Sequence, residues 1–282
     1  MSASPSSHAQ AAREVIAGRL RELRVEAEIT GHELAVRCGW SPAKSSRIER
    51  ARTAPSDADI RAWCAACGAD DQVRDLVAAN RRADRLYVHW KKLHRHGMRG
   101  AQDEVVPLYE RTRLFRVYCS NVVPGMLQTE AYATALLSAI ADFQGTPDDA
   151  PDAAASRVER YEVLHDGRHR FVLLIEEAVL RHRVGDPATM AGQLGYLLAV
   201  MALPQVSLGI VPAGAERRVW PLEAFYMFDD RQVSVELLTA GVNVTAPGEI
   251  AVYAKAFSRL TGMAVHGQAA RALISEAIEF HG

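Results

Sequence analysis

The sequence predicts a chain of two parts, an all-α helix-turn-helix headpiece followed by an α+β domain with a small, mostly antiparallel sheet. Its 282 residues, 49% of them hydrophobic, suffice for one large packed domain or two ordinary ones. Only helical patterns fill residues 13–85, whereas helical and β-like patterns alternate after about residue 105. We therefore expect four segments: a disordered tail over 1–12, the headpiece over 13–80, a basic linker over 81–104 and the α+β domain over 105–282.

Charge divides the chain in the same way. Residues 1–100 hold 18 Lys and Arg against 12 Asp and Glu, a balance of +6, whereas the other 182 residues hold 15 against 22, a balance of −7. A basic front and an acidic back indicate two parts with different partners, a polyanion for the first.

Composition also indicates the compartment. Four cysteines in a chain of this length do not form a disulfide scaffold, and the N-terminus lacks the basic and apolar segments of a secretory signal. Residues 187–215 carry no charge, but Pro204 interrupts the apolar run, which favours a buried helix, a turn and a buried strand over a membrane span. We expect a cytoplasmic protein.

The first headpiece helices have clear sequence signals. Over 12–28, apolar residues recur at helical spacing. A second helix opens at Thr30, where Glu33 completes a capping-box pattern. A third opens at Ser41-Pro42, with a capping side chain followed by proline in the first turn.

Two further helices complete the predicted headpiece. One opens at Ser56 and ends at Cys67, before Gly68, and the last runs from near Asp70 through Asn80. The basic stretch that follows is expected to be a helical or extended connector, either a solvated linker or a nucleic-acid contact.

The second part alternates between the two kinds of structure. Helices are expected over 104–117, 127–143, 156–164, 188–203, 250–263 and 267–280, and strands over 171–175, 206–211, 224–228 and 233–238. Residues 144–155 have the composition of an acidic, mobile loop. The strands near 206, 224 and 233 are close in sequence, which favours antiparallel pairing.

The segment 30–49 carries the functional signal. Ala35 is small where two helices must cross closely, and Gly39 supplies the left-handed turn. Leu34, Cys38, Trp40 and Ile48 provide a small core. With both caps, this is a helix-turn-helix pattern; the alternative is an ordinary helical hairpin.

The chain resembles a known family along most of its length. The headpiece resembles the XRE (lambda/434 repressor-like) helix-turn-helix regulators in the motifs Gly18-Arg-Leu-Arg-Glu-Leu-Arg24, Leu34-Ala35, Gly39-Trp-Ser-Pro42, Ser46-Arg-Ile-Glu49 and Thr53-Ala-Pro-Ser56. The second part is similar to the C-terminal domain of WhiJ-like, antitoxin-like actinobacterial transcriptional regulators in Val123-Pro-Gly-Met-Leu-Gln-Thr-Glu-Ala-Tyr-Ala133, Glu177-Ala-Val-Leu-Arg181 with Val184-Gly185, Val206-Ser-Leu-Gly-Ile-Val-Pro212 and Val235-Glu-Leu-Leu-Thr-Ala-Gly241.

Three positions depart from the pattern of that family. Gly31 stands where many relatives have Gln, a side chain that usually helps to hold DNA. Ser45 stands where Val or Ile is usual, and we expect a carbonyl one turn back to satisfy its hydroxyl. Ala51 replaces the usual glycine after the third helix.

With Ile48 facing inward, helical spacing places Pro42, Ala43, Ser46, Arg47 and Arg50 on the outer face of the third helix. In the resembled family this face enters the major groove.

Each residue of that face has an expected role. Arg47 is the expected reader of guanine O6/N7, Ala43 contacts a thymine methyl, and Ser46 binds a base or a phosphate. Thr30 and its helix N-terminus are expected to hold a phosphate. Lys44, Arg50 and Arg52 are candidate backbone contacts, the alternative for the last two being a solvated surface charge.

Other chemistry has weaker support in the sequence. Cys64 and Cys67 have zinc-like spacing, but no second ligand pair follows, and His94 and His96 alone make no metal site. Glu176-Glu177 fits acid–base work less well than a structural role, and no nucleophile elbow or phosphate loop occurs. Trp220-Pro221 either rims a ligand or partner surface or covers the core edge. We expect no catalytic activity, cofactor or metal.

These observations predict a sequence-specific, DNA-binding transcriptional regulator that binds double-stranded DNA as a homodimer, because one short helix reads only a few base pairs. The resemblance implies that the second part receives a signal from a small acidic protein partner. The main alternative is a small-molecule sensor with a ligand pocket in that part. An enzyme carrying a DNA-binding headpiece and a pure interaction module are further alternatives.

Overall fold

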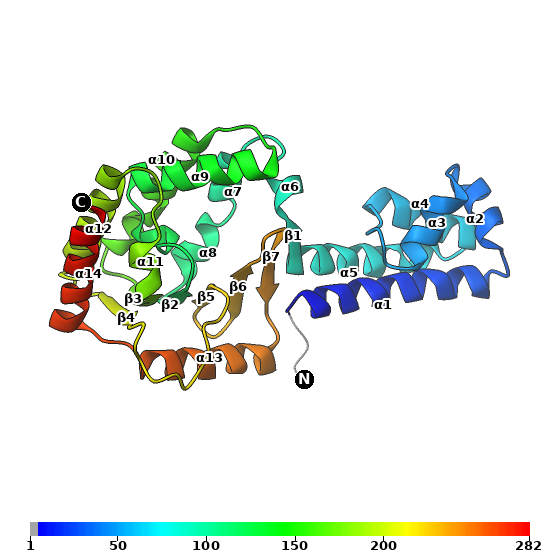
Figure 1. Ribbon diagram of the computed structural model, residues 1–282. Coiled ribbons are helices and arrows are strands. Elements are labelled where there is room, and N and C mark those ends of the chain that lie inside the picture. The colour runs from blue at the N-terminus through cyan, green and yellow to red at the C-terminus, as the bar shows by residue number, and fades with distance from the viewer. Residues whose placement is uncertain (1–4) are drawn as a thin grey trace. The chain divides into compact units, whose positions relative to one another are not determined.

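A computed structural model describes residues 5–282, so the first four residues of the predicted tail lie outside the described part of the chain. The chain divides into two compact units, Met1–Val88 and His89–Gly282, and each unit is described by itself (Figure 1).

The first unit is helical from Pro5 to Leu86 apart from its connections, as predicted. Its elements are α1 (Pro5–Glu26), α2 (Gly31–Cys38), α3 (Pro42–Glu49), α4 (Asp57–Cys67), the 3-10 helix η1 (Asp70–Gln72) and α5 (Val73–Leu86). Leu20, Leu34, Ile48, Ile60 and Trp63 are fully buried between these helices. The Trp63 indole donates a hydrogen bond of 2.9 Å to the Leu20 carbonyl oxygen, which satisfies the polar atom of the largest core side chain.

Local signals set most helix boundaries of this unit. Thr30 forms the predicted capping box with Glu33, and Gly39 and Gly68 adopt the left-handed conformation that ends α2 and α4. Ser41 is the N-cap of α3, but its side chain makes no capping hydrogen bond. Helix α1 begins at Pro5, eight residues before the predicted start of the headpiece. The first turn of a helix tolerates a proline, and no proline or glycine follows Pro5 before Gly18, so nothing breaks the helix there.

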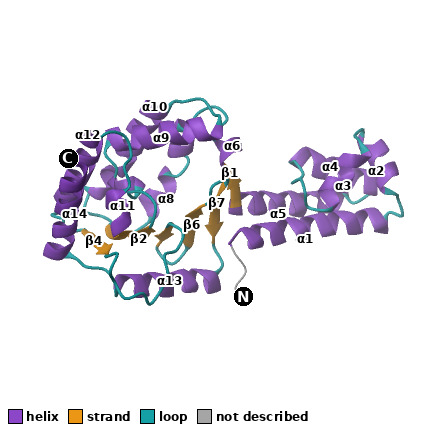
Figure 2. Cartoon of the chain, in the orientation of Figure 1, coloured by secondary structure: helices purple, strands orange, loops and turns teal. Residues whose placement is uncertain are grey.

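The second unit combines helices with a sheet (Figure 2). Its helices are α6 (Trp90–Leu93), α7 (Arg99–Asp103), α8 (Val106–Arg111), η2 (Gly125–Leu127), α9 (Glu130–Gln144), α10 (Ala150–Arg160), η3 (Tyr161–Leu164), α11 (Glu177–Arg181), α12 (Pro187–Val200), α13 (Pro247–Thr261) and α14 (Gly267–His281). Its strands are β2 (Leu114–Cys119), β3 (Arg170–Glu176), β4 (Val206–Val211), β5 (Phe225–Phe228), β6 (Gln232–Glu236) and β7 (Ala240–Val244).

Six strands of this unit form a mixed sheet in the order β7-β6-β5-β2-β3-β4, which confirms the α+β class. A short strand, β1 (Tyr87–His89), contains the boundary between the units. Strand β2 pairs in parallel with β3, and β3 with β4; the pairs β2–β5, β5–β6 and β6–β7 are antiparallel. Figure 1 shows α9, α10 and α12 on one side of the sheet and α13 on the other.

Three predictions for this unit are wrong. Residues 114–117, assigned to a helix, form most of the central strand β2, where Phe115 and Val117 are fully buried. Strand β4 pairs with β3 and not with β5, so only the pairing of β5 with β6 follows the antiparallel prediction. The segment 144–155, predicted as a loop, contains the start of α10, because Ala153 and Ala154 pack into a fully buried cluster with α9.

The uncharged stretch over 187–215 folds as the predicted helix, turn and strand. No helix among the described residues has the length and the apolar character to cross a bilayer.

Candidate nucleic-acid interface

Helix α3 has a buried inner face and an exposed outer face. Ile48 and Ser45 point inward and are almost completely buried. Pro42, Ala43 and Arg47 are exposed on the outside. Ser46 shares that side and is half-buried, and Arg50 at the helix end is exposed. The five residues predicted to share an outer face therefore all keep access to solvent.

An ion pair fixes the start of α3 to α4. The Lys44 Nζ atom lies 2.5 Å from Asp59 Oδ1 and 4.4 Å from the centroid of the Trp40 ring. Asp59 also accepts a hydrogen bond from the Ser56 backbone N–H in the capping box of α4. Lys44 therefore has a positioning role that the sequence did not reveal, beside its predicted contact with the DNA backbone.

This contact also affects the acidity of Asp59. Burial raises the pKa of the carboxyl, but hydrogen bonds from Lys44 and Ser56 outweigh burial and hold the pKa below its ordinary value. The carboxylate is therefore the form that the folded headpiece favours.

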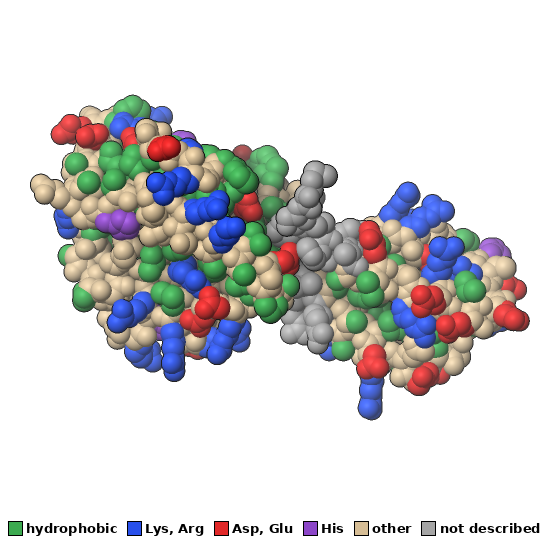
Figure 3. Space-filling model, turned by 90° about the horizontal axis from the view of Figure 1, so that it is seen from below, with side chains coloured by type: hydrophobic (Ala, Val, Ile, Leu, Met, Phe, Trp, Pro, Cys, Tyr) green, Lys and Arg blue, Asp and Glu red, His purple; other side chains and the backbone are tan. Residues whose placement is uncertain are grey.

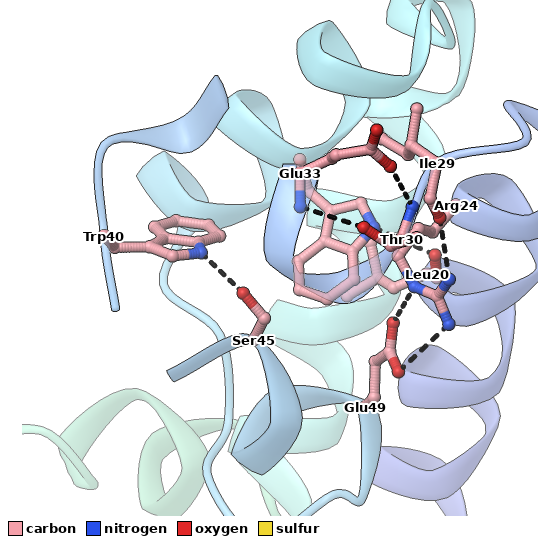
Figure 4. Close-up of polar contacts among 9 residues, drawn as sticks. Leu20, Arg24, Ile29, Thr30, Glu33, Trp40, Ser45 and Glu49 are labelled. Carbon is pink, nitrogen blue, oxygen red and sulfur yellow. Dashed lines mark hydrogen bonds and ion pairs between the residues drawn. The ribbon is translucent and has the colours of Figure 1, made fainter. Parts of the chain in front are cut away.

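A second ion pair fixes the end of α3 to α1 (Figure 4). The Arg24 Nε atom lies 2.5 Å from Glu49 Oε1, and Nη2 donates to Oε2 over 3.4 Å. Arg24 Nη1 also donates to the Ile29 carbonyl oxygen over 2.8 Å. Both charged side chains are only 16% exposed, so solvent screens the pair less than a surface pair. Helix α3 is thus held at both ends.

Ser45 has a different partner from the one predicted. Its hydroxyl accepts a hydrogen bond of 2.8 Å from the Trp40 indole N–H, across the turn before α3, where a carbonyl one turn back was predicted (Figure 4). The indole lies in this turn within reach of Ser45, and its N–H needs an acceptor because Trp40 is half-buried. A polar residue at this core position therefore serves the packing of Trp40.

The N-terminus of α2 carries its own negative charge. Glu33 accepts a 2.7 Å hydrogen bond from the Thr30 N–H, and the Thr30 hydroxyl accepts one of 3.1 Å from the Glu33 N–H. Hydrogen bonding from Thr30 lowers the pKa of Glu33, so the carboxylate stays ionised. A phosphate at this end would use the remaining first-turn N–H groups, which have no partner within the helix.

Three arginines follow one another at the end of α3. Arg47, Arg50 and Arg52 are exposed, and none forms an ion pair with a residue that the structure describes. Ala51 between them has a positive φ of 53°, which explains why glycine is usual at this position. The turn brings the Arg52 N–H to 2.9 Å from the Arg47 carbonyl oxygen, so the three cations lie on one short segment.

The charge surplus of the front half lies outside the helix-turn-helix. Residues 15–77 hold ten basic and ten acidic side chains, whereas residues 81–99 hold seven basic and one acidic. On the face of the first unit seen in Figure 3, acidic and basic side chains are interspersed. Any attraction of residues 15–77 for a polyanion therefore comes from the local arrangement of cations and not from their net charge.

The structure also shows the surroundings of the cysteines and of the Glu176-Glu177 pair noted in the sequence. All four cysteines are free thiols, and burial raises the pKa of Cys67 to about 11. Glu176 accepts hydrogen bonds from Tyr118 and Arg217, and Glu177 accepts one from the Ala213 N–H.

No group of three His, Cys, Asp or Glu side chains suited to a metal occurs within residues 5–282 as described. Trp220 is 72% exposed, so it does not cover the core edge.

Sequence reasoning missed Arg24 and Asp59, the two residues that anchor α3. Asp59 had a local signal, because Ser56-x-x-Asp59 is itself a capping-box pattern. Arg24 had none, since its partner lies 25 residues away along the chain.

Comparison with known proteins gives two family matches. Residues 15–77 match a family described as "Helix-turn-helix domain", which suggests DNA binding, and residues 103–276 match one described as "Domain of unknown function (DUF5753)". No curated protein matches the chain.

One solved structure is similar, that of TrmBL2, described as an archaeal chromatin protein with a novel mode of DNA binding. The alignment with that structure covers 85% of this chain and 88% of that chain at 11% sequence identity. Its TM-score of 0.32 is too low for any conclusion. The family match over 103–276 spans more than half of the 282 residues, and the chain therefore belongs to the DUF5753 family, with a helix-turn-helix domain in front of the family's domain.

Proposed function

We propose that the chain is a sequence-specific, DNA-binding transcriptional regulator of the XRE type, whose α3 reads operator DNA in the major groove. The observation that carries the proposal is the state of α3: its inner face is buried, ion pairs hold both ends, and Pro42, Ala43 and Arg47 on its outer face are exposed in the part of the chain that the structure describes. A helix that is fixed in this way loses little conformational freedom when it binds.

In this proposal Arg47 is the residue that reads the bases. It is exposed on the outer face and is not neutralised by any acidic residue that the structure describes, so its guanidinium is available for guanine O6 and N7. Such a bidentate contact is worth about 1–3 kcal/mol of discrimination. Ala43 contacts a thymine methyl, and Ser46 binds a base or a phosphate.

Phosphate contacts fall to residues on either side of α3. Arg50 and Arg52 are exposed cations at its end, and Pro42 lines the entry of the helix into the groove. Thr30 and Lys44 are the remaining phosphate contacts. Lys44 acts through the positive charge that its ion pair with Asp59 does not neutralise. These contacts position the helix and do not specify sequence.

The regulatory part of the proposal concerns the DUF5753 domain. Two headpieces on two half-sites add their binding free energies, so we propose a homodimer on double-stranded DNA. By its resemblance to WhiJ-like regulators, the domain receives its signal from a small acidic protein. The exposed Trp220, close in sequence to the exposed Arg218, is the kind of aromatic and basic surface that suits such a partner.

The proposal is tested by selecting the genomic fragments that the full chain binds and then comparing variants on the best fragment and on random DNA. Arg47→Ala removes most of the preference for the selected fragment. Arg50→Ala weakens binding to both DNAs and lowers the salt slope by about one. Arg74→Ala, an exposed arginine on α5, serves as the matched control and leaves both unchanged. Equal loss on both DNAs for Arg47→Ala would remove it as the base reader.

A further inference from the structure

Helix α10 ends in an arginine that has no acidic partner. Arg160 Nη1 donates to the Gln102 carbonyl oxygen over 2.6 Å, and Nη2 donates to the Tyr161 hydroxyl over 2.8 Å. Its Nε atom is buried and makes no hydrogen bond, and no carboxylate among the described residues lies within ion-pair distance. A half-buried cation with a spare donor and only neutral acceptors is costly to keep unless a counter-ion arrives.

Arg157, one turn earlier on α10, is in the same situation. Its Nε donates to Gln102 Oε1 over 3.2 Å and its Nη1 to Gln128 Oε1 over 2.7 Å. Both acceptors are neutral amides. Two positive charges therefore lie side by side on one helix, without a carboxylate partner in the part of the chain described here.

Aromatic rings form the walls around Arg160. Its guanidinium carbon lies 4.6 Å from the Tyr161 ring centroid and 5.1 Å from the Tyr109 ring centroid. The Tyr109 ring packs in turn on Phe228 of β5, with centroids 5.5 Å apart. These contacts hold the guanidinium above the β5 side of the sheet.

The sheet below these rings is polar. Tyr226 of β5 is paired in register with Ser234 of β6, so both side chains lie on the same face as Phe228. On this face Ser234 donates to Asn243 Oδ1 over 2.7 Å, while Val233 and Val235 occupy the opposite face and are buried. An ordinary packed core would place apolar side chains here, as β2 and β3 do farther along the same face.

The loop before α9 leaves room for the two tyrosine hydroxyls. The Gly125 N–H donates to the Tyr226 hydroxyl over 3.0 Å, and a Cβ at Gly125 would lie 2.8 Å from the Tyr161 hydroxyl. A glycine is thus needed for both hydroxyls to approach this backbone. It belongs to the motif 123–133 noted in the sequence.

We propose that Arg160, the rings of Tyr109 and Tyr161, and the polar face of β5 and β6 form a binding site for a small organic anion, whose carboxylate or phosphate group pairs with the Arg160 guanidinium. The Tyr109 and Tyr161 rings, which are buried, hold the guanidinium in place for this pairing. This site lies entirely within the second unit. The proposed site does not depend on DNA binding by α3. It gives the DUF5753 domain a small organic anion as its ligand.

The test uses thermal unfolding of the full chain in chloride, in acetate and in inorganic phosphate at equal ionic strength. For the parent chain, one of the two probes at ten times its Kd raises the Tm by about 3–5 °C above the value in chloride. Arg160→Met abolishes this rise, because it removes the guanidinium that pairs with the anion. Arg183→Met, an exposed arginine of the same unit, keeps the full rise and serves as the control.

The two probes also distinguish the sources of the anion. A rise with acetate alone assigns a carboxylic acid, and a rise with phosphate alone assigns a phosphate ester. If Arg160→Met does not fold, Arg160→Lys keeps the charge but loses the planar fork, and it weakens probe binding at least tenfold. Equal rises in the parent and in both Arg160 variants would show general exclusion of the anions from the surface, or binding elsewhere, and would overturn the proposal. Absence of any rise would overturn it as well.

Discussion

The hydrogen bond between Ser45 and Trp40 allows a sharp test of how the headpiece is built. Ser45→Ala removes the acceptor of the 2.8 Å bond from the indole N–H. A typical hydrogen bond contributes about 0.5–1.5 kcal/mol to stability, and Trp40 is half-buried, so water replaces the lost acceptor only in part. Alanine is also the better helix former by about 0.5 kcal/mol, which masks part of the loss.

Ser46 supplies the matched control for this experiment. It is the next residue of the same helix, and Ser46→Ala brings the same gain in helix propensity without removing the bond to Trp40. The difference in free energy of unfolding between the two variants is then about 1 kcal/mol, equivalent to about 4–8 °C in the Tm of a unit of this size. Calorimetry of the full chain measures it in the transition of the first unit.

A double-mutant cycle completes this test. In a Trp40→Phe background the indole donor is absent, so Ser45→Ala and Ser46→Ala become equally stable. If the two serine variants already unfold at the same temperature in the parent background, or if the difference between them survives Trp40→Phe, the assignment of Ser45 to Trp40 is refuted.

Three further outcomes are expected of the headpiece. Glu49→Gln removes the negative charge that faces Arg24 and lowers the stability of the first unit by about 1–3 kcal/mol in denaturant titrations; no change would refute the anchoring of α3. Ala51→Gly relieves a positive φ and raises stability by about 0.5 kcal/mol, whereas Ala51→Val lowers it in the same assay. Because the pKa of Asp59 is lowered in the folded state, the contribution of its carboxylate to stability is fully present above the ordinary value of 3.8 and is lost as the pH falls through the folded pKa. The difference in free energy of unfolding between the parent and Asp59→Asn therefore shrinks over that pH range. A difference that stays constant would contradict this assignment.

Features that depend on neighbours in the sequence were predictable. The capping box of Thr30 and Glu33, the left-handed turn at Gly39 and the helix end before Gly68 follow from local backbone chemistry, and the structure confirms them. The exposed side of α3 follows from helical spacing once Ile48 is placed inside.

Features that depend on tertiary contacts were not predictable. The apolar spacing over 104–117 fits a helix as well as a strand, and only pairing with β3 and β5 makes Leu114–Cys119 a central strand. Helix α10 forms in a loop-like sequence because burial of its alanines against α9 outweighs the local preference. The ion pairs that anchor α3 join residues 15 and 25 positions apart, so no local pattern predicts which residues pair.

The central claim is that the outer face of α3 reads base edges, and competition binding on the selected genomic fragment tests it most directly. The ratio of affinities for this fragment and for random DNA is measured for the parent chain and for Arg47→Ala at two salt concentrations. The account predicts that the ratio falls at least about fivefold for Arg47→Ala while affinity for random DNA changes little, since a lost bidentate base contact is worth about 1–3 kcal/mol. A parent chain that binds both DNAs equally, or an Arg47→Ala variant with an unchanged ratio, would contradict it.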